Sequence, residues 1–83
     1  MNGECFLEIL DGLCSIEKDE SLPKNVKLKI KCAIESLNNE NIGLHLRIDK
    51  SLEELGSIAE DPNTPSYARS QILSMVSLLE SRA

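Results

Sequence analysis

Three cysteines and one histidine are the residues of this chain that are best suited to bind a transition metal. Together they have the ligand count of a Cys3His zinc site. Structural zinc sites usually pair their ligands with roughly two to four residues between them. Here successive members are 9, 18 and 13 residues apart, and the first two would point in opposite directions on one helix. We therefore expect no metal at Cys5, Cys14, Cys32 and His45.

The sequence also contains no motif that is typical of acid–base or nucleophilic catalysis. His45 has Asp49 four residues further on, a spacing that is typical of a contact within one helix. The chain contains no Gly-x-Ser-x-Gly, glycine-rich phosphate loop or His-Glu-x-x-His motif. The carboxylate pairs Asp49/Glu53 and Glu4/Glu8 are typical of solvated helix faces. We expect that the protein is not an enzyme and uses no cofactor.

A cluster of lysines is the strongest charge pattern. Lys24, Lys27 and Lys31 have the spacing i, i+3 and i+7, which places them on one face of a helix, and Lys29 lies close by. The simpler interpretation is a solvated face opposite acidic neighbours such as Glu35. The alternative is an anion-binding or nucleic-acid-binding face.

Length and composition limit the classes of protein that fit. With 83 residues, the chain is long enough for one domain, 1–83, and too short for two cores. Its net charge of -5 repels polyphosphate, and Phe6 and Tyr67 are its only aromatic residues, so stacking platforms for bases are missing. Nucleic acid is therefore an unfavourable partner.

The start of the chain and the cysteine count predict the compartment. Residues 1–5 lack the basic and apolar regions of a signal peptide, and no apolar run approaches the roughly 20 residues of a membrane span. Three cysteines at irregular spacing do not form the even framework of a secreted disulfide scaffold. We expect reduced thiols, no membrane association and a cytoplasmic location.

An internal repeat determines how these residues are positioned. Sliding the sequence by 42 residues aligns residues 10–38 with 52–80 without a gap and yields eight identities, where chance would give roughly two or three. This period is typical of HEAT and armadillo units, each of which contains two helices. The identical pairs are Leu10/Leu52, Leu13/Leu55, Ser15/Ser57, Ile16/Ile58, Asp19/Asp61, Pro23/Pro65, Ile30/Ile72 and Leu37/Leu79.

Apolar residues recur at helical spacing within each repeat, and no segment has the alternation of a strand. The sequence therefore predicts an all-α fold of four helices, arranged as two HEAT-like helical hairpins in one compact bundle. Repeat one covers about 4–38 and repeat two about 42–81. The expected helices cover about 4–18, 22–38, 42–60 and 64–81.

The motif Asp-x-x-x-Pro stands at the same place in both repeats. Proline is tolerated in the first turn of a helix, so we expect one helix to start just before each proline. A good capping residue stands two positions before each proline, and each aspartate can meet exposed amides at the positive end of the helix dipole. The residues predicted to form these turns and caps are Asp19, Ser21, Pro23, Asp61, Asn63 and Pro65.

Several motifs resemble a known family. The run 52–55 leads to Asp-Pro-Asn-Thr-Pro-Ser-Tyr-Ala-Arg at 61–69 and ends at 77–80, while 22–26 matches the corresponding turn of the first repeat. These segments are similar to the archaeal uncharacterised protein family 0147, which more often has His at position 67. The resemblance implies a four-helix fold and an archaeal source, and it carries no established activity.

Apolar residues outside the helical stripes suggest a function. Two repeats must either close on each other as a four-helix bundle or share an apolar face with another chain. We expect a small non-enzymatic protein-interaction module that self-associates, most simply as a symmetric dimer with Leu73 or Leu78 in its interface. The alternative is a nucleic-acid-associated or ribosome-associated accessory factor that uses the lysine face. The apolar residues outside the stripes are Leu7, Leu28, Ile42, Leu44, Leu46, Leu73 and Leu78.

Overall fold

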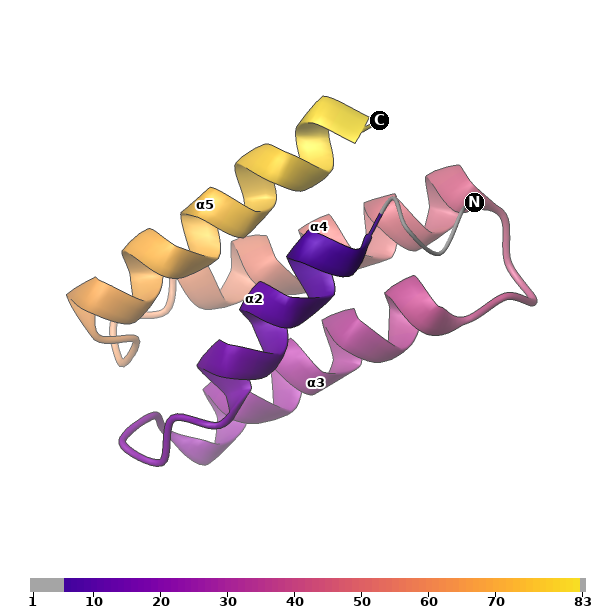
Figure 1. Ribbon diagram of the computed structural model, residues 1–83. Coiled ribbons are helices and arrows are strands. Elements are labelled where there is room, and N and C mark those ends of the chain that lie inside the picture. Colours follow the sequence, from indigo (N-terminus) through magenta and orange to yellow (C-terminus); the bar gives the residue numbers. More distant parts are fainter. Residues whose placement is uncertain (1–5, 83) are drawn as a thin grey trace.

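Four helices make up the fold, as the sequence predicts, and residues 6–82 contain no strand. The computed structural model describes these residues (Figure 1). The helices are α2 (Leu7–Glu17), α3 (Lys24–Asn38), α4 (Leu44–Ala59) and α5 (Ser66–Arg82).

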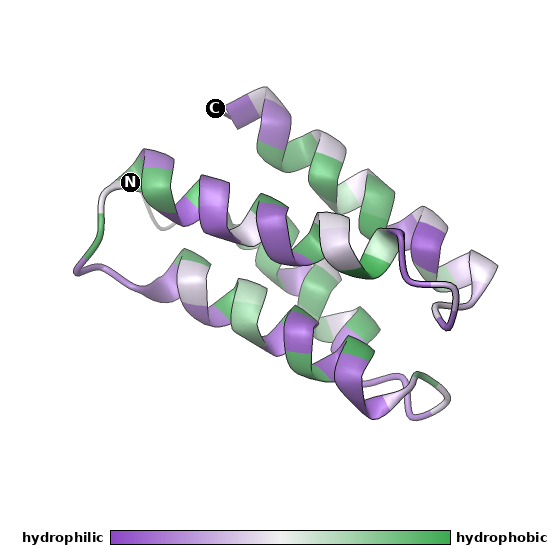
Figure 2. Cartoon of the chain, turned by 180° about the vertical axis from the view of Figure 1, so that it is seen from behind, coloured by the Kyte–Doolittle hydropathy of each residue, from purple (hydrophilic) through white to green (hydrophobic). Residues whose placement is uncertain are grey.

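Each helix turns one apolar stripe inward, because its hydrophobic residues recur every three or four positions. Figure 2 shows hydrophobic and hydrophilic segments recurring along the helices. Burial of each large aliphatic side chain stabilises the fold by about 1.5–3 kcal/mol. The helical residues of this core are Ile9, Leu13, Ile16, Val26, Ile30, Ala33, Leu37, Ile48, Leu55, Ile58, Ala68, Ile72 and Leu79.

The two hairpins close on each other as a four-helix bundle. Hairpin 1 consists of α2 and α3, and hairpin 2 consists of α4 and α5. Across the hairpins, α3 packs on α4 and α2 packs on α5, so the helices form a closed ring (Figure 1). This order of contacts stays the same if α2 is exchanged with α4 and α3 with α5. The core is therefore covered on all sides by the chain itself.

The turns inside the two hairpins have the same backbone hydrogen bonds at positions 42 residues apart. Two of these bonds close the end of the first helix of each hairpin, and a third closes the turn that follows. The repeat in the sequence is thus a repeat in the local structure. The pairs of N–H···O=C bonds are Lys18 to Cys14 (3.1 Å) and Glu60 to Gly56 (3.2 Å), Asp19 to Ile16 (3.1 Å) and Asp61 to Ile58 (3.2 Å), and Leu22 to Asp19 (3.3 Å) and Thr64 to Asp61 (3.0 Å).

The expected helix starts need a correction. The helices α3 and α5 begin at Lys24 and Ser66, directly after Pro23 and Pro65, and not before them. Pro23 has an extended ψ of 151°, so it lies outside the helix, and its carbonyl accepts the N–H of Lys27 at 3.1 Å. Each proline thus occupies the flanking position, where its missing N–H removes no helical hydrogen bond.

Two polar side chains are buried, and both donate to backbone carbonyls. The Ser51 hydroxyl donates to the Ala33 carbonyl at 3.1 Å and joins α4 to α3. The Thr64 hydroxyl donates to the Ile58 carbonyl at 2.6 Å and closes the end of α4. Within residues 6–82, no buried side-chain nitrogen or oxygen lacks a partner, so the core contains no polar group that awaits a ligand.

Candidate functional site

The structure does not bring the possible metal ligands together. Cys14 and Cys32 are free and exposed on α2 and α3, and His45 is exposed at the start of α4. Cys5 lies outside the described residues. In residues 6–82, no three His, Cys, Asp or Glu side chains are grouped in a way that could hold a metal ion.

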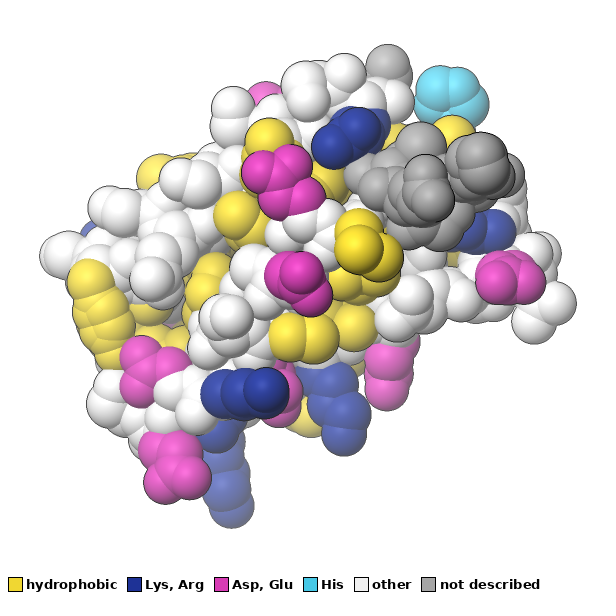
Figure 3. Space-filling model, viewed as in Figure 1, with side chains coloured by type: hydrophobic (Ala, Val, Ile, Leu, Met, Phe, Trp, Pro, Cys, Tyr) yellow, Lys and Arg dark blue, Asp and Glu magenta, His cyan; other side chains and the backbone are white. Residues whose placement is uncertain are grey.

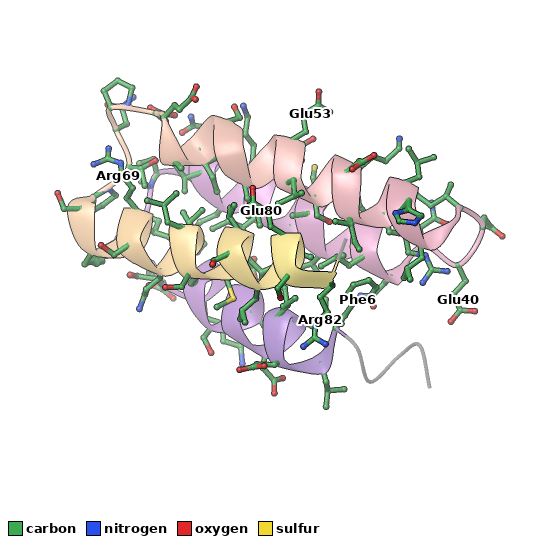
Figure 4. All side chains as sticks on the ribbon, turned by 90° about the horizontal axis from the view of Figure 1, so that it is seen from above. Phe6, Glu40, Glu53, Arg69, Glu80 and Arg82 are labelled. Carbon is green, nitrogen blue, oxygen red and sulfur yellow. The ribbon has the colours of Figure 1, made fainter. Side chains whose placement is uncertain are left out.

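The candidate acid–base residues are also separate and solvated. His45, Asp49 and Glu53 are all exposed, and Glu53 points away from the bundle in Figure 4. Glu4 lies outside the described residues. Over the described part of the chain, the one ion pair within 4.0 Å joins Arg82 to Glu8, whose side chains are 35% and 70% exposed. A pair this long and this exposed contributes little to stability.

The turns inside the two hairpins lie at one end of the bundle, where side chains join each turn to a helix of the other hairpin. Asp19, in the first turn, accepts the Tyr67 hydroxyl of α5 at 2.6 Å and the Ser21 hydroxyl at 2.6 Å. The two hydroxyl oxygens are themselves 2.7 Å apart. The Ser21 hydroxyl, the Tyr67 hydroxyl and the Ser21 backbone N–H all hydrogen-bond this carboxylate, and they hold the pKa of Asp19 below its ordinary value.

A second side-chain hydrogen bond joins the hairpins at the equivalent positions of the repeat. The Asn25 side-chain amide of α3 donates to the Asp61 carboxylate at 3.2 Å. Asp61 is the equivalent of Asp19, and Asn25 is the equivalent of Tyr67. Each aspartate therefore bonds to the residue six positions after the other aspartate. We call these five residues, which are Asp19, Ser21, Asn25, Asp61 and Tyr67, the turn clasp.

The predicted caps need a second correction. Ser21 and Asn63 do not cap the helices, because α3 and α5 start three residues after them. Instead, the backbone N–H groups of Ser21 and Asn63 donate to Asp19 and Asp61 at 3.0 and 2.9 Å. These are Asx-turns, in which an aspartate binds the amide two residues further on. Both aspartates thus order the turns and do not meet helix amides.

The turn clasp has the contacts of a structural element, and within residues 6–82 its hydroxyl groups have no partner that would make them nucleophilic. A hollow between α2 and α5 reaches it, and Asp19 is the one ionisable residue that lines this hollow. Among the described residues, neither hydroxyl hydrogen-bonds to a histidine or lysine that could remove its proton, and Lys27 acts on Asp19 only through its charge. The clasp holds the two hairpins together. The other residues that line the hollow are Gly12, Ser15, Ile16, Gln71, Ser74 and Met75.

The three predicted lysines do lie together. Lys24, Lys27 and Lys31 line a shallow hollow beside α3, together with Glu17, Asn25 and Leu28. Figure 3 shows several Lys and Arg side chains along the lower edge of the molecule, over the first part of α3. Lys29 points elsewhere and donates to the Ser57 hydroxyl of α4 at 2.6 Å. We call the hollow the lysine groove.

Arg69 is a residue whose role the sequence does not reveal. It extends from α5 to the end of α4 (Figure 4), where its Nε donates to the Ala59 carbonyl at 2.8 Å. Its second terminal nitrogen donates to the carbonyls of Asp61 and Thr64, both at 3.2 Å. A cation at the C-terminal end of a helix also interacts favourably with the helix dipole. Arg69 therefore does not belong to the lysine groove.

The two leucines proposed for an interface differ in exposure. Leu73 is 49% exposed on α5, whereas Leu78 is partly buried and packs against the core. Of the other apolar residues outside the stripes, Ile42 is partly buried. The remaining exposed leucines are Leu7, Leu28, Leu44 and Leu46.

These features define a class of protein: a small closed four-helix bundle, whose described residues contain no grouped metal ligands and no helix long and apolar enough to cross a membrane. Comparison with known proteins specifies the family. Residues 1–81 match the model of the uncharacterised protein family UPF0147, and the chain belongs to this family.

Archaeal relatives and a crystal structure support this assignment. The chain is 34% identical to a UPF0147 protein of Thermoplasma volcanium over 83 residues, which are 100% of this chain and 93% of that protein. It is 35% identical over 79 residues to a UPF0147 protein of Methanosarcina acetivorans, covering 95% and 81% of the two chains. A crystal structure of a UPF0147 protein from Thermoplasma acidophilum matches with a TM-score of 0.91 and 30% identity, covering 99% of this chain and 96% of that one.

Proposed function

We propose that the protein is a small, non-enzymatic protein-interaction module that self-associates as a symmetric dimer through hairpin 2. One observation carries the proposal: three of the five exposed leucines lie on this hairpin. They are Leu44 and Leu46 on α4 and Leu73 on α5. Because the bundle already buries its own core, these side chains are surplus to the fold of one chain.

A two-fold dimer suits such a surface. An isologous interface pairs a patch with the same patch of the second copy, so it buries the exposed leucines of both subunits at once. Leu46 and the partly buried Leu52 line a shallow hollow on α4 together with Asp49, Lys50 and Glu53, and a side chain of a second copy can fill it. Removal of about 100 Å² of apolar surface from water contributes roughly 2.5 kcal/mol.

The separated candidate residues support the non-enzymatic part of the proposal. Catalysis needs a nucleophile, acid or base whose reactivity is adjusted by a partner in a pocket. Asp19 is the described residue whose carboxyl pKa is lowered, and its partners are hydroxyls and an amide within the turn clasp. A cytoplasmic location belongs to the same proposal.

Sedimentation equilibrium at micromolar concentrations tests self-association. We expect a dimer of twice the 9.2 kDa chain mass, and we expect Leu73→Glu to shift the equilibrium to monomer. Leu28→Glu is the matched control, since Leu28 is an exposed leucine on hairpin 1 and the same charge is added. Leu73 is chosen over Leu78 because Leu78 is partly buried against the core, so Leu78→Glu would also disturb the fold. A wild-type monomer, or equal effects of Leu73→Glu and Leu28→Glu, would refute this interface.

A second candidate function is a nucleic-acid-associated or ribosome-associated accessory factor. Its support is the lysine groove, in which three cations lie close together without a carboxylate within 4.0 Å among the described residues. Nucleic-acid binding of this kind weakens steeply as salt is raised, and replacement of the three lysines by Gln would abolish it. The net charge of -5 and the scarcity of aromatic residues place this function second.

A further inference from the structure

The lysine groove is a second surface, separate from hairpin 2, and it combines charge with apolar area. Leu28 is 62% exposed, the largest exposed fraction among the large hydrophobic residues described. Lys24 precedes it by four positions and Lys31 follows it by three, so both lie next to it on α3. The aliphatic stems of lysines also add apolar surface beside their charged ends.

No lysine of the groove forms an ion pair within 4.0 Å among residues 6–82, although the charge of Lys27 helps to lower the pKa of Asp19. Residues 6–82 contain one ion pair within 4.0 Å, Arg82 to Glu8, and it lies away from the groove. The neighbouring Lys29 is engaged by Ser57, and Arg69 is engaged by carbonyls at the end of α4. Glu17 is the one acidic residue that lines the groove, opposite three lysines. The groove therefore keeps a local positive charge on an acidic protein.

The spacing of the groove fits a helix. Lys24 and Lys31 are seven residues apart on α3, which corresponds to about 10 Å along the helix axis. Carboxylates on one face of a partner helix, at i, i+3 or i+4 and i+7, have the same spacing. An apolar residue between those carboxylates would meet Leu28. The complementary surface is thus an acidic amphipathic helix.

Nucleic acid fits the groove less well. A phosphate backbone would meet the three lysines but leave Leu28 exposed, and the net charge of -5 opposes its approach. Of the two aromatic residues, Phe6 is buried and Tyr67 belongs to the turn clasp, so neither is in the groove to stack on a base.

We propose that the lysine groove binds an acidic amphipathic helix of another protein, with its carboxylates on Lys24, Lys27 and Lys31 and an apolar side chain on Leu28. Charge and apolar contact then act on the same ligand. The proposal is independent of self-association, because the groove is built on hairpin 1.

Fluorescence anisotropy with a synthetic helix tests it. The probe is a labelled peptide of about 18 residues, long enough to be helical, with Glu at i, i+3 and i+7 around one Leu. We expect the triple variant Lys24→Gln, Lys27→Gln, Lys31→Gln to bind it about tenfold more weakly. The control variant Lys18→Gln, Lys50→Gln, Arg82→Gln removes the same number of charges elsewhere and should bind within about twofold of wild type.

Two further measurements separate the outcomes. Leu28→Ser should weaken peptide binding and leave any binding to a single-stranded RNA of equal charge unchanged. Leu73→Glu should leave peptide binding unchanged, so a failure of self-association is not mistaken for a failure of the groove. Equal losses in the triple variant and its control, no effect of Leu28→Ser, or tighter binding of the RNA than of the peptide would overturn the proposal.

Discussion

Replacement of Arg69 by Met should destabilise the bundle more than any other change of a single surface cation. The substitution keeps a long apolar stem and removes the three hydrogen bonds to the carbonyls of Ala59, Asp61 and Thr64. Those carbonyls belong to the end of α4 and the turn that leads into α5. Loss of the cation therefore weakens the connection inside hairpin 2.

The geometry sets the expected size of this effect. A hydrogen bond to a charged group contributes about 1.5–3 kcal/mol when it is well shielded. Arg69 is only partly buried, and two of its three bonds are long, so water can replace part of the loss. We expect the free energy of unfolding to fall by about 2–3 kcal/mol. For a domain of this size, the Tm should fall by roughly 10–20 °C.

Urea unfolding followed by circular dichroism measures the change, and Arg82→Met is its matched control. Arg82 is on the same helix, but its one ionic contact, to Glu8, is 4.0 Å long and exposed (Figure 4). Its replacement should change the free energy of unfolding by less than about 1 kcal/mol. If Arg69→Met cost no more than Arg82→Met at an unchanged m-value, the three carbonyl contacts would not stabilise the turn.

Two further predictions concern the helices and the turn clasp. Gly56→Ala should stabilise the fold by about 0.5–1 kcal/mol, since a Cβ there would meet nothing within 4 Å and α4 would gain a better helix former. Gly12→Ala, whose Cβ would lie 2.5 Å from the Met75 sulfur, should gain less in the same urea experiment, and a larger gain would contradict the packing of α2 on α5. Asp19→Asn should destabilise the protein at pH 7. Because the folded pKa of Asp19 is lowered, its contribution is present above the ordinary value of 3.8 and is lost as pH falls through the folded pKa. Melts of both proteins from pH 7 to 2 should therefore converge at acid pH, and a constant difference would refute the role of the carboxylate.

The sequence predicts the helices and the core because both depend on local spacing. The pair Leu13/Leu55 and the pair Ile30/Ile72 stand on helical stripes in both repeats, and all four side chains are fully buried. The same periodicity does not reveal where a helix begins. The helices α3 and α5 start directly after Pro23 and Pro65. At Pro23 the backbone is extended and ends the turn, which a stripe of apolar residues cannot indicate.

The turn clasp could not be predicted from spacing, because its partners are far apart in the chain. Tyr67 is 48 residues from Asp19, and Asn25 is 36 residues from Asp61. A signal was nevertheless present in the repeat: both polar partners stand six residues after an aspartate. Once the packing of α2 on α5 and of α3 on α4 is known, this offset pairs each aspartate with a helix of the other hairpin. The contacts of Arg69 left no such signal, because they end on backbone carbonyls.

Residues 42 positions apart in the two hairpins differ on the surface, and these differences give each hairpin a different surface. Arg69 binds the end of α4, whereas its equivalent Lys27 lines the lysine groove. Leu73 is exposed on α5, and its equivalent Lys31 also lines the groove. Core pairs such as Leu13/Leu55 and Ile30/Ile72 are alike in type and burial, but these surface pairs are not. Hairpin 1 therefore presents three lysines around Leu28, whereas hairpin 2 presents Leu44, Leu46 and Leu73, so the dimer and the acidic helix that we propose would use different side chains.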